Sequence, residues 1–383
     1  MSAWPERVVD VETPEAAAEA ARRLSGASEL AVDLEADAMH AFRARLCYVQ
    51  VASDEEVVLF DTLRPGVAVQ ELAGQLDDPS ITKFFHAAMG DLQYLAEVGL
   101  RVSGLFDTHR AATLLGWPKV GLADLVRERA GIELTKQFQQ ADWSVRPLLP
   151  GMHEYLANDV RYLVQIGREV RDACREADVL EEVELDCARM CHEAVARPAE
   201  GAAWRPKLPR QGTTPAQRAL ALALARALHA RRLRWAEEAN VPMGRMLSNA
   251  AITEVALHPP STLDQLRRIQ GVRGPFVREH GETVLELVAT LQGQQADGLL
   301  PAEDEGERPS PGQRRRAEAL KTWRSERAAK RKVTPGVVLS NPLLDTLASA
   351  PPDTLEELGQ VPFFGEKRVQ LYGAELLELL RKA

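Results

Sequence analysis

The chain has 383 residues, of which 45% are hydrophobic and 27% are charged, and its formal net charge is −9 at pH 7. These values are ordinary for a soluble globular protein, and the length predicts two or three domains with cores of their own. No uninterrupted apolar stretch is long enough to cross a bilayer, which excludes a membrane-spanning protein.

The charge is unevenly distributed between the two halves of the chain. Residues 1–200 carry 20 Lys and Arg against 35 Asp and Glu, whereas residues 201–383 carry 27 against 21. An acidic first half cannot attract a polyanion unaided, so metal ions would have to offset its charge locally. The two halves are therefore expected to have different functions.

The cysteines and the N-terminus indicate where the protein works. Four cysteines at positions 47, 174, 187 and 191 have no disulfide-framework spacing, and the first residues show no secretory signal. We therefore predict a reducing, cytoplasmic location.

Taken in chain order, the first half alternates strand-like and helix-like runs. A helix is predicted over 14–24, with Thr13 as its N-cap. Strands are predicted over 29–35, 45–53, 56–62 and 81–86, and helices over 67–76, 91–98 and 108–115. Antiparallel strands followed by strands alternating with helices predict an α/β fold, a mixed sheet with helices on both faces.

Two acids stand at the end of the first apolar run, Leu30-Ala31-Val32-Asp33-Leu34-Glu35. Side chains alternate along a strand, so Asp33 and Glu35 point to the same face. Adjacent carboxylates repel each other. A solvated strand end and a site for a hard divalent cation are both consistent with the pair.

Two further acidic signals follow. His86 ends a strand and Asp91 opens the next helix, where an acid is also favoured by the helix dipole. Tyr155 and Asp159 are four residues apart and share one face of a helix, as many surface pairs do. Each signal is weak in isolation.

In combination, the three motifs resemble those of the DEDD superfamily of 3′–5′ exonucleases, whose catalytic domain has a ribonuclease H-like fold. The resemblance covers residues 29–165 and rests on Asp33-x-Glu35, His86-x4-Asp91 and Tyr155-x3-Asp159. The segment from Gln140 to Leu148 also resembles the lead-in to the third motif in the ribonuclease D family. Glu154 stands where the superfamily's other branch has histidine, which indicates the Tyr branch.

The resemblance implies a role for each motif residue. Asp33, Glu35, Asp91 and Asp159 would hold two Mg²⁺ or Mn²⁺ ions, which prefer oxygen ligands. Asp33 would bridge both ions, and Tyr155 would orient the attacking water.

Other polar residues lie near the motifs. Asp107 is expected to cap a helix or to support the site from behind. His86 is likewise expected to support the site, a cap or a turn, with substrate contact as the alternative. Lys136, Gln140 and Arg146 could contact the substrate, and a solvated surface is the competing interpretation for these three.

The second half contains two similar segments, offset by 92 positions in the numbering. Leu247-Ser248-Asn249 recurs as Leu339-Ser340-Asn341, and Pro259-Pro260-x-Thr262-Leu263 recurs as Pro351-Pro352-x-Thr354-Leu355. Both segments resemble the HRDC domain, a compact all-helical module. Two such modules after the nuclease is the arrangement of the ribonuclease D family.

Each HRDC-like segment opens with a basic helix. Residues 205–235 contain eight Lys or Arg and no acid, and residues 313–332 contain nine against two acids. These basic residues could contact the phosphates of a nucleic acid, or they could form a solvated helix face, and both interpretations fit the sequence. The candidate contacts are Arg231, Arg234, Arg324 and Arg327.

The predicted organisation has three domains and two linkers. The exonuclease domain with trailing helices covers 1–200, a linker covers 201–212, and the first HRDC-like domain covers 213–292. A flexible linker over 293–312 precedes the second HRDC-like domain over 313–383.

The resemblance implies a metal-dependent 3′–5′ exoribonuclease that trims 3′ extensions of structured RNAs such as tRNA precursors, releasing nucleoside 5′-monophosphates. RNA is the expected partner, and neither a membrane nor an obligate protein partner is expected. A 3′–5′ DNA exonuclease and a catalytically silent RNA-binding scaffold are the alternatives. A helicase is not favoured, because the chain has no G-x4-G-K-[ST] phosphate loop.

Overall fold

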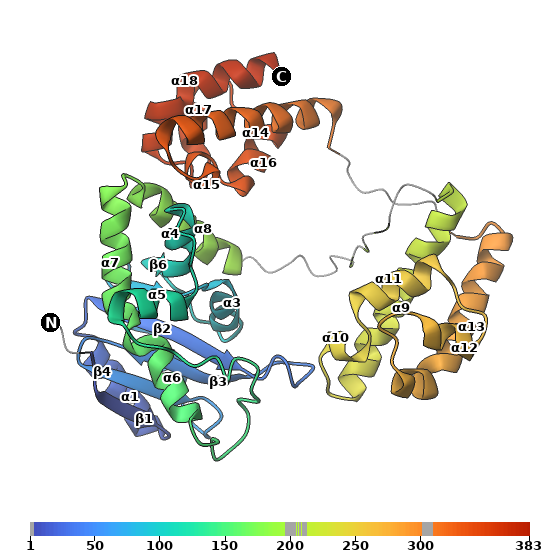
Figure 1. Ribbon diagram of the computed structural model, residues 1–383, viewed down its shortest axis with the longest axis horizontal. Helices are drawn as coiled ribbons and strands as arrows, with labels where there is room; N and C mark the ends of the chain where they lie inside the picture. The colour runs from blue at the N-terminus through green and yellow to red at the C-terminus, as the bar shows by residue number, and fades with distance from the viewer. Residues whose placement is uncertain (1–3, 196–203, 205, 207, 209–212, 301–308) are drawn as a thin grey trace. The chain divides into compact units, whose positions relative to one another are not determined.

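The structure is a computed structural model that describes residues 4–195, 204, 206, 208, 213–300 and 309–383. These residues form two compact units (Figure 1). One contains residues 4–36, 46–195 and 309–383, and the other contains residues 37–45 and the described residues from 204 to 300. Below, residues 4–36 and 46–195 are called the α/β domain, 213–300 the first helical domain and 309–383 the second helical domain.

A six-stranded mixed sheet forms the centre of the α/β domain. Its strands are β1 (Arg7–Val11), β2 (Glu29–Ala36), β3 (Leu46–Ala52), β4 (Glu56–Asp61), β5 (Thr82–Phe85) and β6 (Leu105–Asp107). Their spatial order is β1-β4-β3-β2-β5-β6; β3 runs antiparallel to β2 and β4, and the other neighbours are parallel. The predicted mixed sheet is confirmed, whereas β1 and β6 were not predicted as strands.

Strand β2 occupies an inner position because its alternate residues are apolar. Val32 is fully buried, while Asp33 and Glu35 keep partial exposure on the same face. In the antiparallel pair with β3, Asp33 is opposite Gln50 and Glu35 is opposite Tyr48. The acidic pair therefore lies in the middle of the sheet rather than at an edge.

Helices flank the sheet, and those up to residue 115 match the predicted ranges to within a few residues. Before β6 these are α1 (Pro14–Leu24), the 3₁₀ turn η1 (Val69–Leu72), α2 (Ala73–Asp77) and α3 (Met89–Glu97). After β6 come α4 (Thr108–Leu114), α5 (Leu122–Ala130), α6 (Met152–Arg161), α7 (Leu163–Glu176) and α8 (Leu180–Val195). Helix α6 lies over β2, β3 and β4, and α8 packs against β6 and α3. Helix α6 thereby brings Tyr155 and Asp159 to the acidic strand.

The two helical domains share one pattern of five helices. The first has α9 (Pro215–Glu238), α10 (Met243–Met246), α11 (Asn249–Leu257), α12 (Leu263–Arg268) and α13 (Gly274–Ala296). The second has α14 (Pro311–Arg331), α15 (Pro335–Val338), α16 (Asn341–Ser349), α17 (Leu355–Gln360) and α18 (Glu366–Lys382). The sequence repeat is thus a structural repeat, and both tryptophans of the basic helices, Trp235 and Trp323, are buried.

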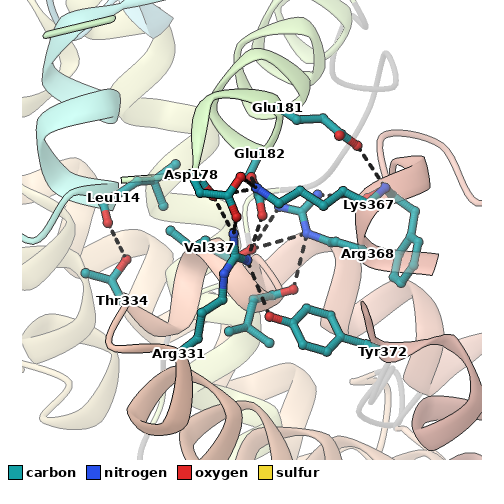
Figure 2. Close-up of polar contacts among 12 residues, drawn as sticks. Leu114, Asp178, Glu181, Glu182, Arg331, Thr334, Val337, Lys367, Arg368 and Tyr372 are labelled. Carbon is teal, nitrogen blue, oxygen red and sulfur yellow. Dashed lines mark hydrogen bonds and ion pairs between the residues drawn. The ribbon is translucent and has the colours of Figure 1, made fainter. Parts of the chain in front are cut away.

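The second helical domain packs against the α/β domain. Arg331 and Lys367 both bind Glu182 of α8, and Thr334 donates a hydrogen bond to the Leu114 carbonyl oxygen at 2.9 Å (Figure 2). Val337 is fully buried and belongs to the α/β core. The domain is therefore fixed to the nuclease by polar and apolar contacts together.

The predicted second linker is partly wrong. Helix α13 continues to Ala296, because a single glycine such as Gly293 is tolerated inside a long helix. Helix α14 begins at Pro311, with Ser310 and Gln313 forming a capping box. Residues 301–308, and nearly all of the predicted linker 201–212, lie outside the described residues. Among those described, no helix is long and apolar enough to span a bilayer.

Candidate active site

Three carboxylates meet where α6 crosses the sheet. Asp33 and Glu35 extend from β2, and Asp159 extends from α6. One ligand oxygen from each of the three lies within 4.8 Å of the others. The predicted strand pair and the predicted helix residue therefore form one cluster.

Asp91 approaches this cluster from the first turn of α3. It lines the same pocket as the other three acids, although it stands outside the group whose oxygens lie within 4.8 Å. The turn before it is unusual, because Ala87 adopts a positive φ of 65° without being glycine. Asp107 stabilises this turn by accepting hydrogen bonds from the backbone N–H groups of Ala87 at 3.2 Å and Ala88 at 2.7 Å.

Asp107 also caps the next helix, as predicted. Its carboxylate accepts a hydrogen bond from Arg110 N at 2.8 Å at the start of α4, and its side chain is buried. One carboxylate thus satisfies three backbone donors and fixes the direction in which α3 presents Asp91.

The four acids line a pocket with a volume of about 520 Å³. Besides Asp33, Glu35, Asp91, Asp159 and Tyr155, its lining consists of Leu34, His86, Ala87, Gly121, Leu122, Ala123, Leu134, Thr135, Lys136 and Gln139. Much of the remaining lining comes from the start of α5 and from the segment that follows it. A volume of this size suits a ligand as large as a nucleotide.

The carboxylates disfavour one another's ionisation. Burial raises the pKa of Glu35 to about 10, and the charges of Asp33, Asp159 and Asp91 add to this shift. Burial, with Asp33 and Asp107 nearby, raises the pKa of Asp91 to about 9. The pKa of Asp33 rises to about 7, chiefly through burial, and that of Asp159 rises through burial and the Asp33 charge.

This donor set fits a divalent-metal site. Closely spaced carboxylates that disfavour ionisation become favourable when a cation lies among them. Gln50, directly opposite Asp33 on β3, is fully buried, and neither of its side-chain polar atoms has a hydrogen-bond partner among the described residues. Oxygen ligands from carboxylates, with an amide beside them, match hard cations rather than zinc.

Tyr155 is fixed beside the acids by aromatic contacts. Its ring centroid lies 5.8 Å from that of Phe138 and 5.7 Å from that of Trp143. Burial raises the pKa of its hydroxyl, and the charges of Asp159 and Glu35 raise it further. The hydroxyl therefore stays protonated and can donate a hydrogen bond into the pocket.

Comparison with known proteins agrees with this geometry. Residues 8–173 match a family described as 3′-5′ exonuclease, and residues 221–288 and 313–380 each match the HRDC domain. A ribonuclease D from Gluconacetobacter diazotrophicus is 33% identical over 91% of this chain and 87% of its own length.

The chain belongs to the ribonuclease D family.

Other relatives are consistent with this assignment. A ribonuclease D from Acidiphilium cryptum is 30% identical over 98% of this chain and 93% of its own length. The crystal structure of Escherichia coli RNase D, described as an exoribonuclease involved in structured RNA processing, superposes with a TM-score of 0.68. That pair is 27% identical and covers 98% of this chain and 99% of the other. The protein is a 3′–5′ exoribonuclease.

The candidate substrate residues of this ribonuclease D family member divide into several groups. His86 and Lys136 line the catalytic pocket. Gln140 does not, and its neighbour Gln139 lines the pocket instead. Arg231 and Arg234 are exposed on α9 of the first helical domain.

The other three arginines are engaged in contacts within the fold. Arg146 donates to both carboxylate oxygens of Asp61, at 2.7 and 2.6 Å, and lies over the Tyr48 ring. Arg324 donates to the Leu339 carbonyl oxygen and to Asn341, and Arg327 donates to Glu375 at 2.7 Å. Their substrate roles stay predictions, and each already has a structural role.

The wall formed by Gly121, Leu122, Ala123, Leu134 and Thr135 was not predicted. These residues are small, apolar or hydroxylated and have no charge pattern. Only Gly121 gave a local signal, since a glycine directly before an apolar helix can serve as its N-cap.

Proposed function

We propose that the protein trims 3′ extensions of structured RNAs such as tRNA precursors, releasing nucleoside 5′-monophosphates by two-metal-ion hydrolysis. The observation that carries the proposal is the cluster of Asp33, Glu35 and Asp159 carboxylates in one pocket with Tyr155 and Asp91. Family membership supports RNA as the substrate, and the Escherichia coli relative is described as acting in structured RNA processing.

In this proposal the four acids hold two Mg²⁺ or Mn²⁺ ions. Asp33 would be shared between them, Glu35 and Asp159 would hold one ion, and Asp91, which lines the same pocket, would help to hold the other. When bound, such ions lower the pKa of a water molecule and offset the charge that develops on the phosphate and on the leaving oxygen.

Tyr155 orients the water that attacks the terminal phosphodiester. Its protonated hydroxyl, held by Phe138 and Trp143, is placed beside Asp159 and Glu35. A fixed donor at this position selects the direction of attack and excludes competing orientations of the water. Lys136, on the rim, is placed to meet a phosphate of the incoming strand.

The body of the RNA would be held outside the pocket by basic residues. Arg231 and Arg234 are exposed on one helix of an HRDC domain, as phosphate contacts require. Phosphate contacts position an RNA without reading its sequence, so RNA shape would decide which substrates are trimmed. All four cysteines are free thiols, which agrees with the cytoplasmic location that we propose.

The experiment uses a tRNA precursor with a short 3′ tail, labelled at the 3′ end or at the 5′ end, with Mg²⁺, Mn²⁺ or chelator. We expect immediate release of mononucleotide from the 3′ label and a 5′-labelled ladder that stops near the mature end. Chelator should abolish both. Internal cuts, or equal trimming of an unstructured DNA, would contradict the proposal.

Asp33→Asn tests the assigned residues in the same assay. The variant keeps the shape of the side chain and should lose at least three orders of magnitude in kcat, because about 4 kcal/mol of transition-state stabilisation depends on the metals. Glu97→Gln, an exposed acid on α3, is the matched control and should cleave normally. Unchanged cleavage by Asp33→Asn would exclude this pocket as the active site.

A further inference from the structure

His86 is held at the edge of the catalytic pocket by a residue outside the acidic motifs. It follows the last residue of β5 and lines the pocket, and its Nδ1 lies 2.9 Å from Oγ1 of Thr108. Thr108 is fully buried at the start of α4. The imidazole ring is therefore fixed through one nitrogen by a residue that does not line the pocket.

The hydrogen bonds of Thr108 determine which nitrogen carries the proton. A threonine hydroxyl has one hydrogen, and Thr108 Oγ1 donates it to the Phe85 carbonyl oxygen at 3.0 Å. Toward His86 the same oxygen can only accept, so Nδ1 must be the protonated nitrogen. The reverse assignment would leave two buried acceptors facing each other at hydrogen-bond distance, which is unfavourable.

The imidazole is neutral in this environment. Burial, together with the neighbouring His109, whose ring centroid lies 5.4 Å away, lowers the pKa of His86 to about 3. With the proton on Nδ1, the other nitrogen, Nε2, carries a lone pair. Nε2 has no hydrogen-bond partner within the part of the chain that the structure describes.

An unprotonated Nε2 selects against phosphate and in favour of a hydrogen-bond donor. Phosphate oxygens only accept hydrogen bonds, whereas sugar hydroxyls can donate them. The 2′-hydroxyl is the donor that every RNA nucleotide has and every DNA nucleotide lacks. Base amino groups also donate, but they differ from base to base.

We propose that His86 Nε2 accepts a hydrogen bond from the 2′-hydroxyl of the 3′-terminal nucleotide, and that Thr108 is the positioning residue that holds the ring in the accepting tautomer. The proposal rests on the proposed function, because it assigns a sugar-recognising group to the same pocket. It makes His86 a determinant of RNA preference that acts independently of the four acids.

The test uses RNA oligonucleotides that are identical except at the last nucleotide, which is a ribonucleotide, a 2′-deoxynucleotide or a 3′-deoxynucleotide. The rate of removing that nucleotide is measured for each, with all four bases in the terminal position. Wild type should prefer the ribose end over the 2′-deoxy end by about tenfold, as one hydrogen bond to a well-placed acceptor provides.

Three variants distinguish the effect of the hydrogen-bond acceptor at Nε2 from that of the imidazole ring as a whole. His86→Ala should reduce the ribose preference to about one, whereas His86→Gln, whose amide oxygen can reach the Nε2 position, should restore part of it. Thr108→Val, which keeps the side-chain volume, should give an intermediate preference. Thermal melting checks that each variant is folded.

The outcomes are distinguishable. If wild type does not remove nucleotides from any 3′ end, the proposed function has failed before the variants are compared. If wild type trims normally and His86→Ala keeps the wild-type ribose preference, the His86 proposal alone is overturned. A preference that depends on the base or on the 3′-hydroxyl overturns it too. The proposal is also overturned if Thr108→Val keeps the full wild-type preference for the ribose end.

The Mg²⁺ requirement provides a separate check. If His86→Ala needs far more Mg²⁺ on every substrate, Nε2 is a metal ligand and the proposal is wrong.

Discussion

Glu182 of α8 accepts a hydrogen bond from Arg331 Nη1 at 2.7 Å, which joins the α/β domain to the second helical domain (Figure 2). The carboxylate is 1% exposed and also accepts from Lys367 Nζ at 3.2 Å. The equivalent positions of the first helical domain, 92 residues earlier, are Ala239 and Pro275. The two cations that bind Glu182 are therefore specific to the second repeat.

Removing the buried charge should loosen this contact. Glu182→Gln leaves two cations facing a neutral amide, with the exposed Asp178 as their remaining ion-pair partner among the described residues, so we expect the free energy of unfolding to fall by roughly 2–3 kcal/mol. Thermal melting and the rate of proteolysis between the two domains measure the loss. The exposed Glu176→Gln on α7 is the control and should behave like wild type. Equal stability of both variants would show that the Glu182 charge is not needed to hold the domains together.

The hydroxyl of Tyr155 should matter for the chemical step and not for folding. Tyr155→Phe keeps the ring contacts with Phe138 and Trp143, so the melting temperature should not change. The loss of the group that orients the water should lower kcat about 100-fold with little change in KM. Tyr162→Phe, whose ring packs against Trp4, is the matched control. A variant with raised KM and normal kcat would place Tyr155 in substrate binding instead.

Asp107 should influence the metal site through the Ala87 turn. Asp107→Ala removes the acceptor of three backbone N–H groups, so Asp91 loses its fixed direction and half-maximal activity should require several-fold more Mg²⁺. Thr13→Ala removes the N-cap of α1 and should cost a similar amount of stability, about 1 kcal/mol or more, without changing the Mg²⁺ requirement. If Asp107→Ala and Thr13→Ala both lose stability and both keep the wild-type Mg²⁺ requirement, Asp107 acts only as a helix cap.

Sequence reasoning predicted the site from a combination of motifs that resembles a known family, and local periodicity explains why two of these motifs align their residues. Asp33 and Glu35 obey the alternation of a strand, and Tyr155 and Asp159 obey the spacing of a helix, so local geometry alone aligned each pair. The pairing of Asp33 with Gln50 and the docking of Arg331 on Glu182 depend on contacts between residues far apart in the chain, which no local pattern encodes.

Basic residues were the least predictable, for a related reason. Arg146 and Arg327 have carboxylate partners 85 and 48 residues away, and each looked like a surface cation in its own segment. Helix α13 passes the predicted linker boundary at Gly293, because a single exposed glycine inside a long helix costs only about 1 kcal/mol. Local composition could not distinguish these alternatives.

Divalent metal should stabilise the folded protein. A cation among Asp33, Glu35 and Asp159 binds only the folded chain and relieves the repulsion between these acids, so saturating Mg²⁺ or Mn²⁺ at about 100 times Kd should add about 2.7 kcal/mol. The melting temperature should rise with metal and return to its starting value with chelator. Asp33→Asn should lose most of the rise, and Glu97→Gln should retain it. A rise of equal size in Asp33→Asn would mean that the stabilising ion binds elsewhere.

The repeated arginines of the helical domains should divide into structural and RNA-binding residues. Arg232 and Arg324 occupy equivalent positions, and each donates to a leucine carbonyl and an asparagine side chain of its own domain. Arg324→Ala should therefore lower stability by about 1–3 kcal/mol through the loss of these bonds, with little effect on RNA affinity. Arg231 and Arg234 are exposed, and their joint replacement by Ala should leave the melting temperature unchanged.

The same double variant should weaken RNA binding uniformly across sequences. The slope of log K against log salt should fall by about 0.7–0.9 for each phosphate contact that is lost. Fluorescence anisotropy with a tRNA precursor, measured from about 50 to 200 mM salt, determines both quantities. If Arg324→Ala instead reduced the salt slope while the double variant did not, the phosphate-binding face would lie on the second helical domain.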